Sequence, residues 1–409
     1  MSKITKFVLL SISFLLVAFT VAGGLGVQAG SSADGAYRQL QVYTEVLSKV
    51  HTDYVEEPNL PHVTDGALHG LLESLDANSS FLNPTEYKKY KALKDNKANI
   101  GAAVSKRFGY AAVISVIPGG PASKAGVENG DIVEAIEGKS TREMSLAEVN
   151  GALGGLQGSV VNISVVRPRK AQPVKIAITR DLVKEPSVSA KLMDNQTGYI
   201  LVGDFAKGRS QEIATKIKDL QRQGAKKLVL DLRGSGMGDE QEGISASNLF
   251  LNHGTITYVQ GQKYPKQTFT ADAKSAITTL PLVVLVNRST AGPAEVVASA
   301  VLENARGDVL GDKTFGSGSI QNVIEMGDGS ALILSVAKYY TPGGKAIQDT
   351  AITPNITVAD TGDDFVSPDD DGGDNTAPAP DAKKEIKTKP DEQLRRAIEV
   401  LKNKEQKVG

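Results

Sequence analysis

The chain has 409 residues, of which 40% are hydrophobic and 23% charged, an ordinary composition for a soluble globular protein. This length exceeds what one compact core holds and predicts two or more domains joined by linkers. A formal net charge of −1 gives no general attraction to nucleic acid, and the lack of cysteine excludes disulfides, thiolate nucleophiles and thiolate metal sites.

The N-terminal end predicts an export signal. Lys3 and Lys6 precede an apolar run over 7–21, and the small residues that lead to Ala29 suit signal peptidase. The run is shorter than the roughly 20 residues that a membrane-spanning helix needs. We therefore expect cleavage of residues 1–29, and their retention as an N-terminal membrane anchor is the alternative.

Residues 35–98 are expected to form an N-terminal helical segment. Apolar side chains recur at helical spacing from Tyr37 to Tyr54, and a second helix is predicted over 63–75. A turn-rich loop over 75–84 then leads into a further short helix.

Residues 99–182 predict a small, partly open β-barrel. Short β-branched runs separated by turns rich in glycine and proline indicate strands, and a helix is expected near Leu146–Leu153. The expected strands cover 113–117, 132–136, 160–166 and 174–178.

Residues 185–358 alternate strands with helices. Apolar runs at 228–232 and 281–286 predict buried strands, and helices are expected over 210–223 and 293–304. This alternation predicts an α/β layer with parallel strand pairing.

The C-terminal part changes composition. Residues 359–390 are rich in Asp, Gly and Pro, which cannot build a core, so they predict an acidic disordered linker. A solvated charge run is favoured there over a calcium site on Asp369–Asp374. Residues 391–409 predict a final helix, and its apolar stripe consists of Leu394, Ile398 and Leu401.

Histidine gives little support to metal chemistry. No two of the four histidines have the spacing of a zinc helix motif, and none adjoins a catalytic-looking segment. We interpret them as surface or packing residues, and predict no metal site and no cofactor. The four are His51, His62, His69 and His253.

Three segments together resemble one peptidase family. Residues 119–126, followed by Gly130-Asp131-Ile132, are similar to the signature of PDZ domains in bacterial proteases. Residues 311–321 and 334–348 are similar to two specific segments of the C-terminal processing (tail-specific) serine peptidases.

The resemblance covers roughly residues 35–358, and includes the loop over 75–84. It implies an α+β fold in which an N-terminal helical segment and a PDZ domain precede an α/β protease-like core with a C-terminal helix.

The resemblance also implies a catalytic dyad, and neither of its residues stands at the expected position. Family members use a serine nucleophile and a buried lysine of lowered pKa that takes its proton. With Glu295 fixing the register, the nucleophile position is Gly292 and the base position is Ser317. Gln321, which matches a supporting glutamine of the family, is retained.

A third departure concerns the oxyanion region. The turn Gly234-Ser235-Gly236 lacks the proline-glycine pair of the family segment that supplies an oxyanion donor. Thr290 and Ser289 are candidate substitute nucleophiles, but a displacement of about 1 Å already costs about 10²-fold in rate. We therefore favour an inactive member over a rewired hydrolase.

The PDZ resemblance implies a peptide-binding edge. Peptide C-termini add as a strand to such an edge, and backbone amides receive the terminal carboxylate. By resemblance this site begins at Gly101, Ala102, Ala103 and Val104. The alternative is a PDZ fold packed on the core without affinity for peptides.

Together these inferences predict an exported homologue in the bacterial periplasm or cell envelope. It is expected to bind protein C-termini or unfolded tails without cleaving them, and to self-associate through its terminal helices. One alternative is an active serine endopeptidase with a rearranged nucleophile. The other is a structural or chaperone-like envelope protein.

Overall fold

The computed structural model describes residues 31–94, 98–107, 109–167, 172–184, 186–348, 350–359 and 391–408. The expected signal at 1–29 and nearly all of the expected acidic linker, with Asp369–Asp374, lie outside the described residues. Contacts divide the chain into two compact units, and the boundary falls between Ala67 and Leu68, inside the segment expected over 35–98.

The described residues of the first unit, 31–67, are mainly helical, as the periodicity predicted. Its helix α2 (Ser31–Asp53) exposes the large side chains of Tyr37, Leu40 and Val46. Helix α3 (Leu60–Glu73) begins in this unit and ends in the second. In the described part of the chain, no helix combines the length and apolar character needed to cross a bilayer.

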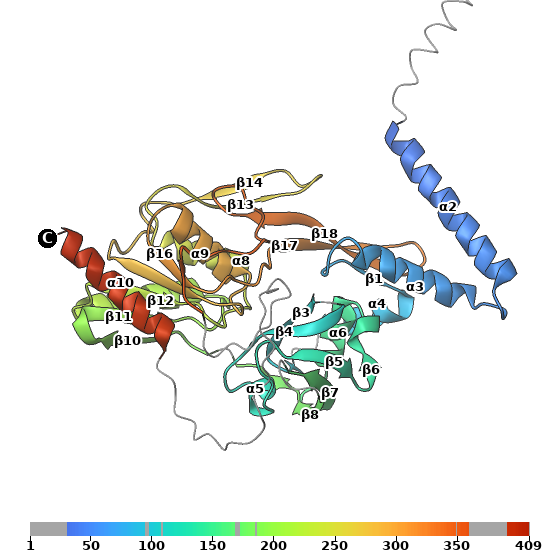
Figure 1. The fold of residues 1–409 in the computed structure, drawn as a ribbon, viewed down its shortest axis with the longest axis horizontal. Coiled ribbons are helices and arrows are strands. Elements are labelled where there is room, and N and C mark those ends of the chain that lie inside the picture. Colours follow the sequence, from blue (N-terminus) through green and yellow to red (C-terminus); the bar gives the residue numbers. More distant parts are fainter. Residues whose placement is uncertain are drawn as a thin grey trace, which may run out of the picture. The chain divides into compact units, whose positions relative to one another are not determined.

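The PDZ region forms the small strand-rich domain that the sequence predicted (Figure 1). Its sheet has the order β3-β4-β5-β7-β8, so β3 and β8 are the edge strands, and β6 pairs with β5. Helix α6 (Leu146–Leu153) starts with a capping box between Ser145 and Glu148. The other elements are β2 (Ala98–Asn99), β3 (Ala102–Arg107), β4 (Tyr110–Val116), α5 (Pro121–Lys124), β5 (Ile132–Ile136), β6 (Lys139–Ser140), β7 (Val160–Val166), β8 (Val174–Thr179) and β9 (Asp181–Leu182).

The protease-like core is built on a six-stranded sheet of order β10-β11-β12-β15-β16-β19. The neighbours from β11 to β19 are parallel, as the alternation of strands and helices predicted, and β10 adds antiparallel at the edge. Its strands are β10 (Ser189–Met193), β11 (Thr197–Leu201), β12 (Lys227–Asp231), β15 (Leu282–Val286), β16 (Asp308–Gly311) and β19 (Ile356–Thr357).

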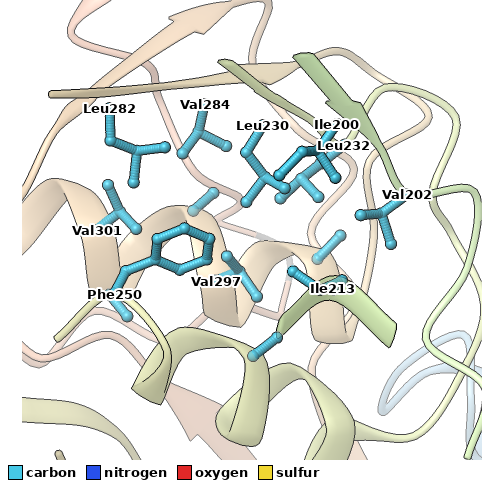
Figure 2. Packing of buried hydrophobic residues seen from close by; sticks show 14 of the residues in the cluster. Ile200, Val202, Ile213, Leu230, Leu232, Phe250, Leu282, Val284, Val297 and Val301 are labelled. Carbon is cyan, nitrogen blue, oxygen red and sulfur yellow. The ribbon is translucent and has the colours of Figure 1, made fainter. Parts of the chain in front are cut away.

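Alternate side chains of the central strands enter two separate apolar clusters, as the two-residue period of a strand requires. Leu228 and Leu230 join the larger cluster with helices α7 (Arg209–Arg222), α8 (Glu240–Asn248) and α9 (Pro293–Glu303). Figure 2 shows this packing, in which Phe250, Val297 and Val301 lie beneath Leu230, Leu282 and Val284. Helix α8 was not predicted from the sequence.

The opposite side of the same strands packs against the C-terminal helix α10 (Glu392–Val408; red in Figure 1). Val229 and Leu285 meet the fully buried Ala397 and Leu401. The predicted stripe is therefore right for Leu401 and Leu394, whereas Ile398 lies outside this cluster and Ala397 occupies its centre.

A second, antiparallel sheet was missed in the sequence. It has the order β1-β18-β13-β14, and β17 pairs with β18. The strands are β1 (Ser80–Leu82), β13 (Thr255–Gln260), β14 (Gln267–Thr270), β17 (Ser319–Glu325) and β18 (Ala331–Tyr340). Strand β1 and the following helix α4 (Pro84–Lys94) tie the loop over 75–84 to the core, because β1 pairs with the start of β18.

The burial of α10 leads to a stability prediction. Leu401→Ala should destabilise the docking of α10 by about 2–5 kcal/mol, because it opens a cavity among fully buried side chains. Amide hydrogen exchange along α10 measures this. Lys402→Ala, which changes the exposed neighbour, is the control and should leave exchange unchanged. Equal exchange in both variants would contradict the packing of α10 on the sheet.

Candidate functional site

Gly292 lies in a sharp turn between strand β15 and helix α9. Its backbone has φ 58° and ψ −121°, the left-handed half of angle space that glycine adopts most easily. A Cβ added at this position would meet no heavy atom within 4 Å. Gly292 itself is buried, and the turn leaves room for a side chain at this position, at the N-terminal end of a buried helix.

One buried carboxylate organises this turn. Glu295 is fully buried, and its Oε2 accepts the N–H of Gly292 at 3.0 Å. The same side chain accepts the N–H of Gly316 at 2.8 Å and that of Ser317 at 2.8 Å, and the hydroxyl of Thr314 donates to it as well. Gly292 and Ser317, the positions at which the sequence led us to expect nucleophile and base, are thus brought together on a single carboxylate through their backbone amides.

The turn at 234–236 packs directly against the Gly292 turn, because the N–H of Ala291 donates to the carbonyl of Ser235 at 2.9 Å. Two of its amides point inward. Gly234 donates to Oδ1 of Asn287 at 3.1 Å, and Ser235 donates to the carbonyl of Leu232 at 3.1 Å. These two N–H groups are therefore already used inside the protein.

The candidate substitute nucleophiles are buried. Ser289 and Thr290 each have no exposed surface. The Thr290 hydroxyl donates to the carbonyl of Leu232 at 2.9 Å and accepts the N–H of Asn287 at 3.0 Å. In this arrangement the Thr290 hydroxyl stabilises the turn.

Gln321 lies on the exposed side of strand β17, two residues beyond the start of that strand. Its Nε2 donates to Oγ of Ser319 at 2.7 Å, so the side chain extends along its own strand. Gln321, Tyr264 and Ser335 help line an open cavity of about 660 Å³.

The proposed peptide-binding residues stand at the start of the PDZ edge strand. Gly101 has φ 72°, and its N–H donates to Oδ1 of Asn99 at 2.7 Å. Ala102, Ala103 and Val104 open strand β3, which pairs with β4 on one side only among the described strands.

The PDZ domain touches the site at two points that the sequence did not reveal. The guanidinium of Arg107, at the end of β3, lies over the ring of Phe315 at 4.6 Å from its centroid. Gly236 lies so close to strand β4 that an added Cβ would meet Oγ of Ser115 at 2.5 Å. The structural role of Glu295 was also missed, since the sequence offered it only as a marker of register.

Comparison with known proteins gives consistent results. Residues 196–358 match peptidase family S41, and residues 113–167 match the PDZ domain. The chain is 32% identical to a carboxy-terminal-processing protease of Bartonella bacilliformis, over 84% of this chain and 82% of that protein. It is 31% identical to a carboxy-terminal processing protease of Bacillus subtilis, over 81% of this chain and 71% of that protein.

A solved structure is similar as well. The photosystem II D1 C-terminal processing protease superposes with a TM-score of 0.65 at 26% identity, and the match covers 78% of this chain and 92% of that chain.

Glu295 predicts a pH-dependent stability. Complete burial raises its pKa from 4.5 to about 7, against the opposing effect of its four donors. The folded protein therefore holds this proton more tightly than the unfolded chain. The resulting stabilisation is complete below about pH 4.5 and is lost as the pH rises through about 7.

We expect Glu295→Gln to remove this dependence. Between acid and neutral pH, the free energy of unfolding of the variant should change less than that of the wild type, by up to about 3 kcal/mol. Urea unfolding at a series of pH values measures the difference. Glu45→Gln changes an exposed carboxylate on α2 and is the control. Parallel profiles for the wild type and Glu295→Gln would contradict the prediction.

Proposed function

Because the chain belongs to peptidase family S41, as a relative of the carboxy-terminal processing proteases, we propose that it binds protein C-termini or unfolded tails without cleaving them. The observation that carries the proposal is the pair Gly292 and Ser317, held on one carboxylate where the family places its nucleophile and base.

Neither position offers the chemistry of a Ser-Lys dyad. Glycine has no hydroxyl to attack a carbonyl carbon, and a serine at 317 has no amine that can take a proton at neutral pH. Acyl transfer by this route needs both groups in hydrogen-bond contact. The loss of both halves therefore removes the nucleophile together with its activation.

Three candidate positions near Gly292 do not offer an oxyanion donor. The residue after a nucleophile commonly donates its N–H to the oxyanion, and here that residue is Pro293, which has no N–H. The amides of Gly234 and Ser235 are used by Asn287 and Leu232. Loss of a single such donor costs about 10²–10³ in rate, so these absences add to the loss of the dyad.

An active peptidase with a relocated nucleophile is less well supported. Ser289 and Thr290 are fully buried, and the Thr290 hydroxyl is committed to the backbone of the turn. A hydroxyl that attacks a peptide must reach the substrate at about 3–3.5 Å. That route would need the turn to open.

Binding of C-termini follows from the PDZ domain. Strand β3 is an edge strand, so an extended peptide has a free row of backbone groups to pair with beside α6. Gly101 precedes this row, and the terminal carboxylate of a bound peptide would lie beside it. A structural or chaperone-like role without peptide affinity is the competing interpretation.

We place the protein in the bacterial cell envelope, as an exported chain. This rests on the basic and apolar pattern of residues 1–29 and on the bacterial relatives. The same proposal includes cleavage of residues 1–29, with their retention as a membrane anchor as the alternative. It also includes self-association through the terminal helices.

The proposal predicts a defined pattern of proteolysis. The wild type should leave casein intact, and Gly292→Ser/Ser317→Lys should gain little because Pro293 cannot donate to an oxyanion. Gly292→Ser/Pro293→Ala/Ser317→Lys should cleave, because it supplies nucleophile, base and donor together. Casein degradation followed on gels measures this, and Gly292→Ser/Pro293→Ala is the control without a base. Cleavage by the wild type that Thr290→Ala abolishes would overturn the proposal.

The PDZ domain should bind peptides by their free C-terminus. A fluorescent peptide with an apolar last residue should bind, and its amidated form should bind about tenfold more weakly, because a charge-assisted hydrogen bond contributes about 1.5–3 kcal/mol. Fluorescence anisotropy measures both affinities.

Ala103→Glu, on the edge strand β3, should weaken binding, whereas Ala177→Glu, exposed on the opposite edge strand β8, should not. Equal affinity for the acid and the amide, or no binding at all, would favour the structural role.

A further inference from the structure

Three side chains from three helices converge outside the site described above. His69 lies near the end of α3, Glu86 in the first turn of α4, and Glu148 in the first turn of the PDZ helix α6. One ligand atom from each lies within 4.8 Å of the other two. From this arrangement we propose that the three residues bind one divalent transition-metal ion, with Zn²⁺ as the best fit.

The spacing is that of ligands around an ion. Nε2 of His69 is 3.5 Å from Oε2 of Glu86 and 4.0 Å from Oε2 of Glu148. Both distances exceed the 2.7–3.2 Å of a hydrogen bond. Zinc bonds of about 2.0–2.2 Å in tetrahedral geometry place two such ligand atoms about 3.4 Å apart. A small inward movement of Glu148 would complete the set.

The donor types also match. Zinc is commonly bound by neutral imidazole nitrogen together with carboxylate oxygen. His69 would supply the imidazole nitrogen, and Glu86 and Glu148 would supply carboxylate oxygens.

The ligands are held in place by neighbouring groups. Glu86 accepts the N–H of Asn83 at 2.9 Å, and Glu148 accepts the N–H of Ser145 at 2.8 Å, so each carboxylate is fixed by the backbone that begins its helix. The ring of His69 is held edge-on by Phe81, with centroids 5.5 Å apart. Such outer contacts orient metal ligands in known sites.

The site is sheltered but accessible. The three side chains are 13–21% exposed, and a cavity of about 380 Å³ lies beside Glu86 and Glu148. Lys139 is 3.4 Å from the other oxygen of Glu148, so it balances part of the negative charge without standing between the ligands. The cavity gives room for water as a fourth ligand.

The ion would act as a structural cross-link. It would join α3 and α4, which belong to the N-terminal part of the chain, to helix α6 of the PDZ domain. The proposal is independent of peptidase or peptide-binding activity.

The test is Zn²⁺ binding by the full chain after removal of metal with EDTA. Isothermal titration with Zn²⁺ should give one ion per chain, and Zn²⁺ should raise the thermal unfolding midpoint. His69→Gln should weaken binding by about tenfold or more and abolish the thermal shift, since even changes outside the ligand set cost that much. The exposed His253 provides the matched control, and His253→Gln should bind as the wild type does.

Glu86→Gln and Glu148→Gln separate metal binding from helix capping, because glutamine also serves in a capping box. Both variants should keep the metal-free unfolding midpoint and lose Zn²⁺ affinity. Absence of Zn²⁺ uptake by the wild type, or undiminished uptake by His69→Gln, would overturn the proposal.

Discussion

The fully buried carboxylate of Glu295 is the interaction on which the site depends. A buried charge is costly unless hydrogen bonds compensate it, and here three backbone amides and one hydroxyl offset part of that cost. These donors join the start of α9 to the loop at 314–317. Since positions 292 and 317 contribute only their N–H groups, their side chains can change without breaking the network. The network therefore forms with glycine at 292 and serine at 317.

The pattern of residues predicted the parts of the fold that are local. The apolar runs of β12 and β15 read as buried strands because both faces of the sheet are covered, by α7–α9 on one side and α10 on the other. The antiparallel sheet escaped prediction because its pairing is distant. Strand β1 has three residues. Its Phe81 pairs with Leu332, and the whole PDZ domain and most of the core lie between these two residues in the sequence. A segment of that length has no periodicity of its own.

The candidate site also has parts that the sequence predicted and parts that depend on distant contacts. The family resemblance assigned the expected nucleophile, base and supporting positions to Gly292, Ser317 and Gln321, because short motifs with fixed spacing can be recognised in a sequence. It gave no information on which amides are already used. That Asn287 takes the N–H of Gly234 depends on a contact between two turns 53 residues apart. The cluster of His69, Glu86 and Glu148 was invisible for the same reason, and sequence spacing alone led us to expect no metal site.

Glycine at 292 and serine at 317 also suit the framework around them. At φ 58° and ψ −121°, any residue with a Cβ is strained by about 1–3 kcal/mol, whereas glycine is not. A lysine at 317 would have to lose solvation to reach the low pKa that catalysis needs, whereas serine carries no charge to desolvate. Active sites keep such costs because chemistry requires them. Gly292 and Ser317 avoid both costs, and Glu295 holds the two positions together through their backbone amides.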